Sequence, residues 1–495
     1  MSLAEAFARS LNEGGSGDAL EYKNHRVSWE ALRGRAERLD RALQADGIGD
    51  GAIVGVPGRN SLASAGAFVG ALASRRCAAL LNPFQPMETV VRAAADAGAV
   101  TLCVEEEDAA SEALADAGSV YVILSDGQIR RHRRHRPAAG PKTDAALLLA
   151  TSGTTGEPKR IAISAQTLHR ALGEIAGFNR GFGDLDQPGH LQPALIQYSP
   201  LAHVAGMLTL ARGVNERRPI VMLEKFEPNQ WTEVVERRKL RTTGLPPAMM
   251  KMVLDANPSR DRLASLISVW SGSAPVDPRV AGEFTRRYDL PVLGNYGATE
   301  FCGAVATWSM DDYRQLHRTK EGAVGRISPS VAAARVRSPE SGEILPLGAV
   351  GVLDLKVYRV GPDWLATNDL AHLDADGFLY LHGRADDAII RGGFKVSPDR
   401  VAAALKAHPD VTEAVVVGIE DARLGSVPVA AVQTRAGAAE PTEAELIACV
   451  KAQLPAYFAP VAVRLVSAIP RTPAMKVDRQ AIRRLFIDLE RRRTS

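Results

Sequence analysis

The stretch Ala145-Ala-Leu-Leu-Leu-Ala-Thr-Ser-Gly-Thr-Thr-Gly-Glu-Pro-Lys159 joins an apolar run to a loop rich in glycine and hydroxyl side chains. The run over 145–150 predicts a buried strand. A Gly- and Thr-rich loop at the end of such a strand can direct several backbone N–H groups and hydroxyls at one polyanion. Lys159 would add a mobile positive charge. This stretch therefore predicts a strand that ends in a phosphate-binding loop.

The spacing in this loop differs from that of the common P-loop. Gly153, Gly156 and Lys159 stand too close together for the pattern G-x-x-x-x-G-K-[ST]. A Gly/Ser/Thr cluster between two strands is also typical of an ordinary surface turn. Both interpretations stay open on this stretch alone, and other parts of the chain have to decide between them.

Helix-like and strand-like patterns alternate along the first half of the chain. A helical period over 29–39 precedes the apolar run 52–57, and an Ala-rich helical pattern from Thr89 leads into the strand-like segment 100–104. The charged amphipathic pattern that begins at Trp231 leads in the same way into a short strand-like segment. Such alternation is typical of a layered α/β fold with parallel strands. With 495 residues the chain exceeds one normal core, so two or three domains are expected.

The pattern changes after Leu381. Two strand-like segments, 413–419 and 427–434, predict two short β/α units, and a helix is expected over 443–454. Roughly 110 residues remain in this part, which is enough for a small domain. We therefore place a domain boundary near Asp386, between residues 1–385 and residues 386–495.

The charge balance gives no general reason to expect nucleic acid as a partner. Lys and Arg total 60 against 57 Asp and Glu, a net charge of +3. The exception is the basic stretch 130–136, which is expected to be an exposed loop because Pro and Gly follow it. This stretch lacks aromatic residues for base stacking, so a solvated loop is the favoured interpretation. A subsidiary hypothesis is that it attracts anionic nucleotides.

The cysteine spacing and the apolar segments point to a cytoplasmic protein that is not an integral membrane protein. The N-terminus carries Glu5 and Arg9 where a signal peptide needs an uninterrupted apolar core. The most apolar window, 65–81, is interrupted by Arg75 and Arg76 and is too short for a bilayer span. Neither disulfides nor a zinc site are suggested by the widely spaced cysteines, which are Cys77, Cys103, Cys302 and Cys449.

Further segments, in one order along the chain, resemble signatures of the adenylate-forming superfamily, in particular its acyl-CoA synthetase branch. They are Ser271-Gly-Ser-Ala-Pro, Gly294-Asn-Tyr-Gly-Ala-Thr-Glu300, Thr367-Asn-Asp369, Gly383-Arg-Ala-Asp-Asp, Gly392-Gly-Phe-Lys-Val-Ser-Pro and Pro470-Arg-Thr-Pro-Ala-Met-Lys476. The resemblance spans nearly the whole chain. It implies a large multi-lobed N-terminal domain of layered mixed sheets and helices, followed by a small mobile α+β C-terminal domain.

The resemblance implies a site for ATP and AMP. The β and γ phosphates would lie in the opening loop, Tyr296 would stack on the adenine, and Asp369 with Arg384 would bind the ribose hydroxyls. Taken alone, Asp369 would suit a helix cap or a turn equally well. The full predicted nucleotide set is Thr151, Ser152, Gly153, Thr154, Thr155, Gly156, Lys159, Gly272, Ser273, Ala274, Asn295, Tyr296, Gly297, Asp369 and Arg384.

The same resemblance assigns catalytic roles. Glu300 would ligate Mg²⁺, Thr299 would contact the α-phosphate, and Lys476 would oppose the charge that grows in the transition state. His203, in Pro200-Leu-Ala-His-Val-Ala-Gly, would gate the thiol tunnel, with a general-base role less favoured. The alternatives are a solvated carboxylate for Glu300, a surface lysine for Lys476 and a structural histidine for His203.

The C-terminal segments and the acyl pocket complete this set. Asp386 matches the hinge position, and Gly392, Gly393 and Lys395 match the CoA tunnel, although a simple hairpin turn suits the two glycines equally well. The acyl pocket is expected to draw on His203, Val204, Gly272, Gly297, Cys302 and Val305. The chain departs from the family twice, since Asn368 and Met475 replace usual glycines. Asn tolerates a left-handed backbone, so we expect the loop at Asn368 to keep its geometry.

These assignments predict an AMP-forming carboxylic acid–CoA ligase that uses ATP, Mg²⁺ and CoA. A carboxylate and ATP would give acyl-AMP and pyrophosphate, and CoA would then displace AMP. An alternative is a stand-alone enzyme that loads an acyl or aryl group onto the pantetheine of a carrier protein. A less favoured alternative is a nucleotide-binding pseudoenzyme. The sequence leaves open whether the acid is fatty, aryl or small and branched, and whether the protein is a homodimer.

Overall fold

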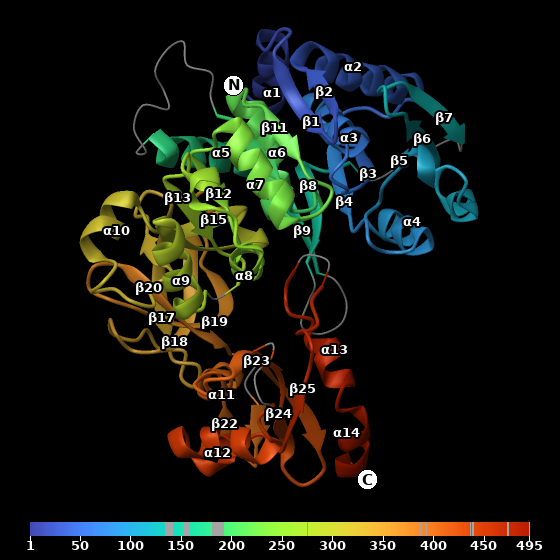
Figure 1. The fold of residues 1–495 in the computed structure, drawn as a ribbon. Coiled ribbons are helices and arrows are strands. Elements are labelled where there is room, and N and C mark those ends of the chain that lie inside the picture. Colours follow the sequence, from blue (N-terminus) through green and yellow to red (C-terminus); the bar gives the residue numbers. More distant parts are fainter. Residues whose placement is uncertain are drawn as a thin grey trace. The chain divides into compact units, whose positions relative to one another are not determined.

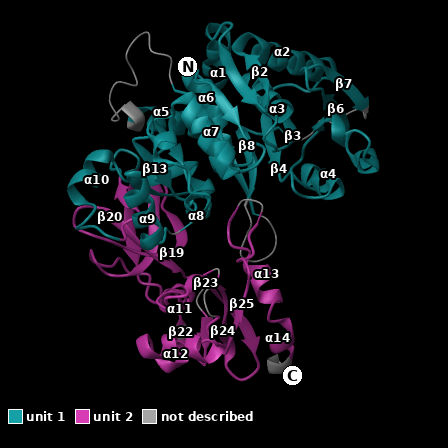
Figure 2. Cartoon of the chain, in the orientation of Figure 1, with its two compact units in different colours: residues 1–321, 328–331, 357–362 teal, residues 322–327, 332–356, 363–495 magenta. Residues whose placement is uncertain are grey.

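The computed structural model describes residues 1–133, 142–151, 159–180, 193–274, 276–385, 389–392, 394–435, 437, 440–472 and 475–494. The chain forms two compact units, which Figure 2 distinguishes by colour. Unit 1 comprises residues 1–321, 328–331 and 357–362, and unit 2 comprises residues 322–327, 332–356 and 363–495. Each unit has sheets and an apolar core of its own.

The strand predicted over 145–150 lies inside a seven-stranded sheet of unit 1 (Figure 1). β3, β4, β5, β6 and β8 pair in parallel, whereas β7 and β9 are antiparallel edge strands. The spatial order is β7 (Ile129–Arg133), β6 (Ser119–Ile123), β5 (Thr101–Glu105), β3 (Ile53–Pro57), β4 (Cys77–Leu81), β8 (Ala145–Thr151) and β9 (Lys159–Ser164). The predicted strand and its parallel surroundings are therefore confirmed.

Helices cover both faces of this sheet. Val54 and Cys103 pack in one apolar cluster with α2 (Trp29–Ala45) and α3 (Leu62–Ala73), while Leu102 and Val104 pack in another with α4 (Met87–Asp96). Neighbouring residues of one strand point to opposite faces, so the two clusters lie on opposite sides. Burial on both faces explains why these strands are almost continuously apolar.

Two further groups of strands belong to unit 1. One is a four-stranded sheet in the order β10 (Leu195–Gln197), β11 (Ile220–Met222), β1 (Asp18–Tyr22) and β2 (His25–Ser28). The other runs through β12 (Thr242–Gly244), β13 (Ser268–Ser271), β14 (Val292–Ala298) and β15 (Gly303–Thr307). The remaining helices are α1 (Leu3–Glu13), α5 (Ala165–Arg180), α6 (Val204–Glu216), α7 (Pro228–Arg238), α8 (Pro247–Ala256), α9 (Pro278–Tyr288) and α10 (Met310–Leu316), with short 3₁₀ turns at Glu106–Asp108, Glu112–Asp116, Arg260–Leu263 and Thr299–Phe301.

Unit 2 contains two groups of strands. The first runs in the order β16 (Gly325–Ile327), β20 (Phe378–Arg384), β19 (Leu365–Leu373), β18 (Gly351–Val357) and β17 (Ala332–Arg337). The second runs in the order β22 (Phe394–Val396), β21 (Ile389–Arg391), β24 (Gly425–Thr434) and β23 (Val411–Asp421), and β25 (Ala462–Leu465) also pairs with β24. The helices of this unit are α11 (Pro398–Lys406), α12 (Glu443–Gln453), α13 (Arg479–Arg484) and α14 (Ile487–Thr494), with a 3₁₀ turn at Ala456–Phe458.

The two short β/α units predicted after Leu381 are wrong, although both strands and the helix exist. β23 and β24 pair antiparallel from Val411 opposite Thr434 to Asp421 opposite Gly425. They therefore form one hairpin, whose short turn leaves no room for the crossover that parallel strands need. The helix expected over 443–454 is α12. This small α+β arrangement agrees with the predicted fold class.

The prediction of an exposed loop over 130–136 is wrong for its first part. Residues 130–133 belong to edge strand β7, and Nη2 of Arg131 pairs with Oδ1 of Asp46 at 2.6 Å. Residues 130–132 are nevertheless exposed, and charged side chains on an edge strand hinder its pairing with another chain. Residues 134–136 lie outside the described residues.

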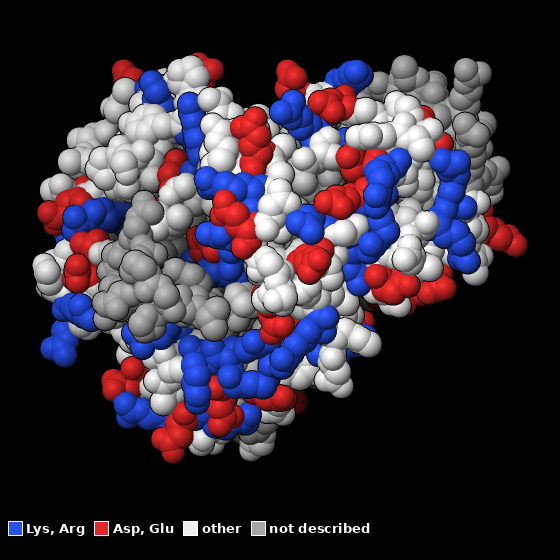
Figure 3. All heavy atoms as spheres, turned by 90° about the horizontal axis from the view of Figure 1, so that it is seen from above, with Lys and Arg blue, Asp and Glu red and all other residues white. Residues whose placement is uncertain are grey.

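The surface carries both signs of charge. On the face drawn in Figure 3, Lys and Arg side chains are interspersed with Asp and Glu, in keeping with the net charge of +3. No helix within the described ranges is long and apolar enough to cross a membrane. The domain boundary near Asp386 stays a prediction, because residues 386–388 are outside the described part of the chain.

Candidate active site

The end of β13 and the middle of β14 bring the two predicted adenine-side segments together. The strands are parallel and pair Ser271, the last residue of β13, with Gly294 of β14, so Gly272 comes next to Asn295 within β14. A Cβ atom on Gly272 would lie 2.0 Å from Oδ1 of Asn295. Only glycine can therefore sit against this amide without displacing it. Gly272 and Asn295, which the sequence predicts to share the nucleotide site, are indeed neighbours.

Thr299 and Glu300 lie in a tight turn between β14 and β15. These strands pair antiparallel, with Ala298 opposite Gly303, and the 3₁₀ turn Thr299–Phe301 joins them. Gly297 has no room for a side chain, because its Cβ would lie 2.3 Å from the carbonyl oxygen of Gly303. The carboxylate of Glu300 is exposed, and Thr299 and Tyr296 are partly buried. The Y-G-x-T-E segment thus presents its acid at the surface of unit 1.

Three residues with a left-handed backbone lie in the predicted catalytic segments. They are Ser273 (φ 69°), Cys302 (φ 54°) and Met475 (φ 60°). Cys302 is the C-cap of the 3₁₀ turn Thr299–Phe301, and Arg217, Lys239, Asn257 and Asp289 end α-helices in the same conformation. A left-handed side-chain residue costs about 1–2 kcal/mol, so surrounding contacts must hold each of these three in place.

His203 begins helix α6. It is the N-cap residue, its backbone N–H donates to the carbonyl of Pro200 at 2.9 Å, and its ring is partly buried. The preceding residue, Ala202, donates its N–H to the carbonyl of Gly58 at 3.2 Å. The segment around His203 is therefore held from both sides. The backbone of His203 is thus fixed at the start of α6, and the role of its side chain stays a prediction.

The predicted acyl-pocket residues differ in burial. Val204 packs against the main apolar cluster of unit 1, and Cys302 belongs to that same cluster. Cys302 and Val305 are 1% and 2% exposed, so neither faces open solvent. Burial raises the pKa of the Cys302 thiol to about 12, which keeps it neutral at physiological pH. Cys302 is therefore suited to an apolar wall and not to nucleophilic chemistry.

Arg359 and Glu174 are two residues of this region that the sequence did not reveal. The Arg359 guanidinium forms an ion pair with Glu174 of α5 and donates hydrogen bonds to the carbonyls of Phe301 and Ala304. All four residues belong to unit 1. Arg359 stands in no motif, so no signal in the sequence could have found it.

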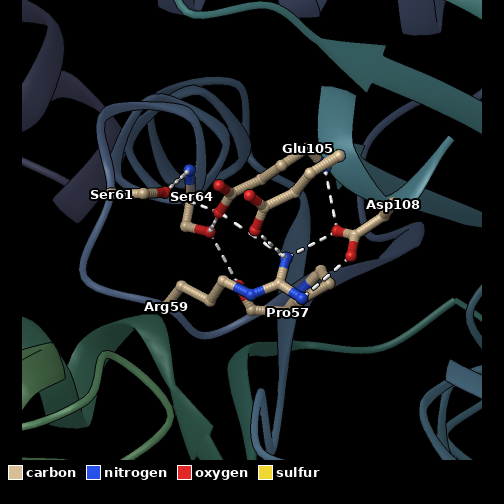
Figure 4. A network of polar contacts seen from close by, with 7 residues as sticks. Pro57, Arg59, Ser61, Ser64, Glu105 and Asp108 are labelled. Carbon is tan, nitrogen blue, oxygen red and sulfur yellow. Dashed lines mark hydrogen bonds and ion pairs between the residues drawn. The ribbon is translucent and has the colours of Figure 1, made fainter. Parts of the chain in front are cut away.

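A partly buried polar network lies where β3 and β5 end (Figure 4). Arg59 binds the carboxylate of Asp108 through both Nη atoms, at 2.5 and 2.9 Å. Oε1 of Glu105 accepts hydrogen bonds from the hydroxyls of Ser61 and Ser64, at 2.6 and 3.0 Å. Burial raises the pKa of Glu105 above its ordinary value, and the hydrogen bond with Asp108 raises the pKa of Arg59.

This network supports the loop beside His203. It holds residues 57–61, and Gly58 in that loop accepts the N–H of Ala202. Asn60 extends the connection, since its side chain donates to the carbonyl of Leu223 at 2.9 Å and accepts from Gln197 at 3.0 Å. No sequence pattern indicated this network, because its two acids lie more than 40 residues from its arginine.

In unit 2, the predicted ribose-binding residues face each other across two strands. Asp369 on β19 is paired in register with Arg384 on β20, and Nη1 of Arg384 lies 3.6 Å from Oδ1 of Asp369. Both side chains are partly exposed. Asn368 lies within β19 and is not among the residues with positive φ, so its tolerance of a left-handed backbone is not needed here. An extended backbone accepts asparagine as readily as glycine.

Lys476 stands on a short hairpin closed by Arg471. The backbone N–H of Thr472 donates to the carbonyl of Lys476 at 2.7 Å, and Arg471 bridges to Val477. Nη1 of Arg471 donates to the carbonyl of Met475 at 3.0 Å, and its Nη2 pairs with Glu413 at 2.5 Å. The Lys476 side chain is exposed. This hairpin holds Met475 in the left-handed backbone that a glycine would adopt without strain.

Other predicted site residues are only partly described. Gly392 lies between the paired strands β21 and β22, so the hairpin-turn alternative is correct for its backbone. Lys159 is exposed at the start of β9, opposite Thr151, the last residue of β8. The backbone of Lys395 lies in β22. The side chains of Thr151 and Lys395 and the whole of Ser152, Gly153, Thr154, Thr155, Gly156, Asp386 and Gly393 lie outside the described residues.

Comparison with known proteins shows the family. A model of the AMP-binding enzyme family matches residues 7–360, and a model of the AMP-binding enzyme C-terminal domain matches residues 400–476. The chain belongs to the AMP-binding enzyme family. Because curated CoA ligases are among its relatives, this family member lies in the acyl-CoA ligase branch of the adenylate-forming superfamily.

Two curated relatives and one solved structure illustrate the match to this family. Sulfoacetate–CoA ligase of Cupriavidus necator is 30% identical over 92% of this chain and 92% of its own length. The 4-coumarate–CoA ligase-like 9 protein of Arabidopsis thaliana is 30% identical over 70% of this chain and 63% of its own. The ATP-bound MatB structure from Rhodopseudomonas palustris superposes with a TM-score of 0.85 at 23% identity, covering 99% of this chain and all of that one, which shows the fold.

These matches confirm the predicted superfamily, the α/β fold and the enzyme class. The AMP-binding enzyme is an AMP-forming acid–CoA ligase, which uses ATP to make an acyl-AMP and then forms an acyl-CoA. Its use of ATP and CoA follows from the family. The roles of individual residues and the metal stay predictions.

Proposed function

We propose that this ligase performs its two half-reactions with Thr299, Glu300, Asp369, Arg384 and Lys476 in contact with the nucleotide. In the first, a carboxylate oxygen attacks the α-phosphorus of ATP, and the bond to the β-phosphate oxygen breaks to release pyrophosphate. In the second, the CoA sulfur attacks the acyl carbon, its proton is lost, and AMP leaves with the electrons of the acyl–oxygen bond. The pseudoenzyme alternative is not retained, given the family match.

The nucleotide contacts divide between a segment for the phosphates and a segment for the sugar. We assign the α-phosphate contact to Thr299, because its turn is fixed at both ends by the paired strands β14 and β15. Asp369 offers two acceptor oxygens for the ribose hydroxyls, and Arg384, which lies 3.6 Å from it, can add donors to the same sugar. The opening loop is proposed to hold the leaving pyrophosphate.

The chemistry of Glu300 fits Mg²⁺. No cluster of three or more candidate metal-ligating side chains occurs among the described residues, so an all-protein metal site is not present there. Mg²⁺ typically takes one or two carboxylates and completes its shell with water and phosphate oxygens, which suits the single exposed carboxylate of Glu300. When bound, the ion would neutralise phosphate charge during transfer.

The acid is proposed to lie beside Val204 and Cys302, with its carboxylate toward the α-phosphate. Cys302 belongs to the main apolar cluster of unit 1 and Val204 packs against it, and burial raises the pKa of the Cys302 thiol. These walls suit an apolar acyl chain or ring. Fatty, aryl and small branched acids remain the candidate substrate classes, and a carrier-protein pantetheine remains the alternative thiol.

The observation that carries this proposal is that one strand, β14, contacts Gly272 through Asn295 and ends in the tight turn that presents Thr299 and Glu300. Its test is pyrophosphate release by the purified protein with ATP and Mg²⁺ over a panel of fatty, aryl and small branched acids. We expect release with one class of acid, and AMP formation that rises when CoA is added. Absence of release with every acid would overturn the proposal. Turnover with a pantetheinylated carrier protein but not with CoA would favour the carrier-protein alternative.

A further inference from the structure

The Arg359 guanidinium lies beneath the turn that carries Thr299 and Glu300. Arg359 is 4% exposed. Its Nε donates to the carbonyl of Phe301 at 2.6 Å and its Nη2 donates to the carbonyl of Ala304 at 2.8 Å, while its Nη1 pairs with Glu174. A buried cation is tolerated only when it is paired and hydrogen-bonded, and each nitrogen of this guanidinium has such a partner.

The carbonyls of Phe301 and Ala304 flank two residues with positive φ. Between them lie Cys302, with φ 54°, and Gly303, with φ 120°. Gly303 adopts its conformation without steric cost, but Cys302 has a Cβ that disfavours the left-handed region. Cys302 ends the 3₁₀ turn as its left-handed C-cap, with one hydrogen bond inside the turn, and contacts from outside the turn can add to this support. The hydrogen bonds from Arg359 do so on both sides of it.

We infer that Arg359, held by Glu174, is a positioning residue that fixes the Cys302 turn and thereby sets the places of Thr299 and Glu300. The carbonyl of Phe301 directly follows Glu300 in the chain, and the N–H of Cys302 donates to the carbonyl of Thr299 at 3.0 Å. A change at Cys302 is thus transmitted to both residues through the backbone. This inference rests on the proposed roles of Thr299 and Glu300.

The shape of the side chain explains why an arginine serves here. The planar guanidinium presents donors in fixed directions, so one group can reach two carbonyls and one carboxylate at once. A lysine ammonium is a compact point charge without this fork. Glu174 on α5 neutralises the buried charge and orients the fork, which ties the turn to a helix of the same unit.

The test is a double-mutant cycle of Arg359→Met and Cys302→Gly. Arg359→Met alone is expected to slow pyrophosphate release roughly 10- to 100-fold, because a small displacement of positioned groups has effects of that order. Cys302→Gly removes the steric penalty of the left-handed turn. In the Cys302→Gly background, Arg359→Met is therefore expected to cost only about a few-fold, a coupling that such a cycle measures directly.

Two further measurements separate positioning from a general loss of stability. The Mg²⁺ concentration for half-maximal pyrophosphate release is expected to rise in Arg359→Met, while thioester formation from synthetic acyl-AMP and CoA stays near the native rate. The matched control is Arg76→Met, which removes another buried arginine. Arg76 is 2% exposed and bonds the carbonyl of Ile48 and the carboxylate of Asp40. This control is expected to leave the Mg²⁺ requirement unchanged.

The outcomes are distinguishable. Equal losses from Arg359→Met in both backgrounds, or an unchanged Mg²⁺ requirement in a folded Arg359→Met protein, would overturn the inference. If Arg359→Met does not fold, Glu174→Gln with the same Mg²⁺ titration decides, and an unchanged requirement there would again overturn it. Failure of the native protein to release pyrophosphate with any acid would instead overturn the proposed function, before any variant is compared.

Discussion

At the scale of single residues, the predicted catalytic segments combine exposed functional groups with a backbone under local strain. Glu300 and Lys476 are exposed, while their neighbours Cys302 and Met475 have a left-handed backbone. In each case an arginine paired with a glutamate donates to a carbonyl of the strained turn: Arg359 with Glu174, and Arg471 with Glu413. The same device thus holds two separate segments.

Lys476→Ala is expected to slow acyl-adenylate formation on the order of 10²-fold or more, because it removes a positive charge that opposes charge growth in the transition state. Pyrophosphate release measures this step. Lys451, an exposed lysine in the last turn of α12, offers the matched control Lys451→Ala, which should leave the rate unchanged. A native rate in Lys476→Ala would show that another group carries this role.

At the scale of elements, polar side chains gather where two apolar strands of the seven-stranded sheet end. This polar junction joins the ends of β3 and β5 to the start of α3. Arg59 and Asp108 join the two strand ends, and Glu105 binds the hydroxyls of Ser61 and Ser64 at the first turn of α3. In the chain, β3 is followed by β4 and β5 is followed by β6, and these next strands lie toward opposite edges of the sheet. In doubly wound sheets, a crevice forms between two strands whose connections diverge in this way. In this chain Arg59, Glu105 and Asp108 lie at this point of the sheet and contact one another.

We expect the difference in stability between Glu105→Gln and the native protein to shift in favour of the variant as the pH rises from 4 to 7. The folded pKa of Glu105 is raised above its ordinary value, chiefly by burial, so the native protein loses stability as the pH rises through that pKa. A glutamine has no such titration, and its Oε1 can accept both serine hydroxyls. Thermal unfolding temperatures measured across this range provide the test.

The control for this prediction is Glu107→Gln. Glu105 and Glu107 each have a carboxylate oxygen 3.9 Å from Nη1 of Arg59, but the Glu107 side chain is 72% exposed. Its replacement is expected to change the stability little, because an ion pair made by so exposed a carboxylate contributes little to stability. Parallel pH curves for Glu105→Gln and the native protein would contradict the raised pKa of Glu105.

At the scale of the whole molecule, the chain is built from two compact units that each carry part of the predicted chemistry. Unit 1 contains Thr299, Glu300 and the Arg359 contacts, and unit 2 contains Asp369, Arg384 and Lys476. The family resemblance predicts that the C-terminal domain rotates between the two half-reactions. Asp386, the predicted hinge, lies outside the described residues, so this motion is a prediction for experiment.

Asp386→Pro is expected to slow thioester formation about 10-fold or more while leaving adenylate formation largely intact. A proline fixes φ, and a hinge has to change its backbone dihedrals between two states. Single-turnover pyrophosphate release and thioester formation from synthetic acyl-AMP measure the two steps separately. Asp386→Ala, which leaves the backbone free, should affect neither step strongly. Equal losses in both steps for Asp386→Pro would argue against a hinge at this residue.

Local pattern was enough to predict the strand of β8, the helices α2 and α12, and the motifs around Glu300 and Lys476, because burial periodicity and short-range turn chemistry are written in neighbouring residues. It failed where partners are distant. The pairing of β23 with β24 and the Arg359 contacts depend on which segments meet in space. The sequence alone determined the family, the enzyme class and the candidate residues. Only the tertiary structure decided how the turn that carries Thr299 and Glu300 is held, because the partners of the buried Arg359, two carbonyls and a carboxylate, are brought to it by folding.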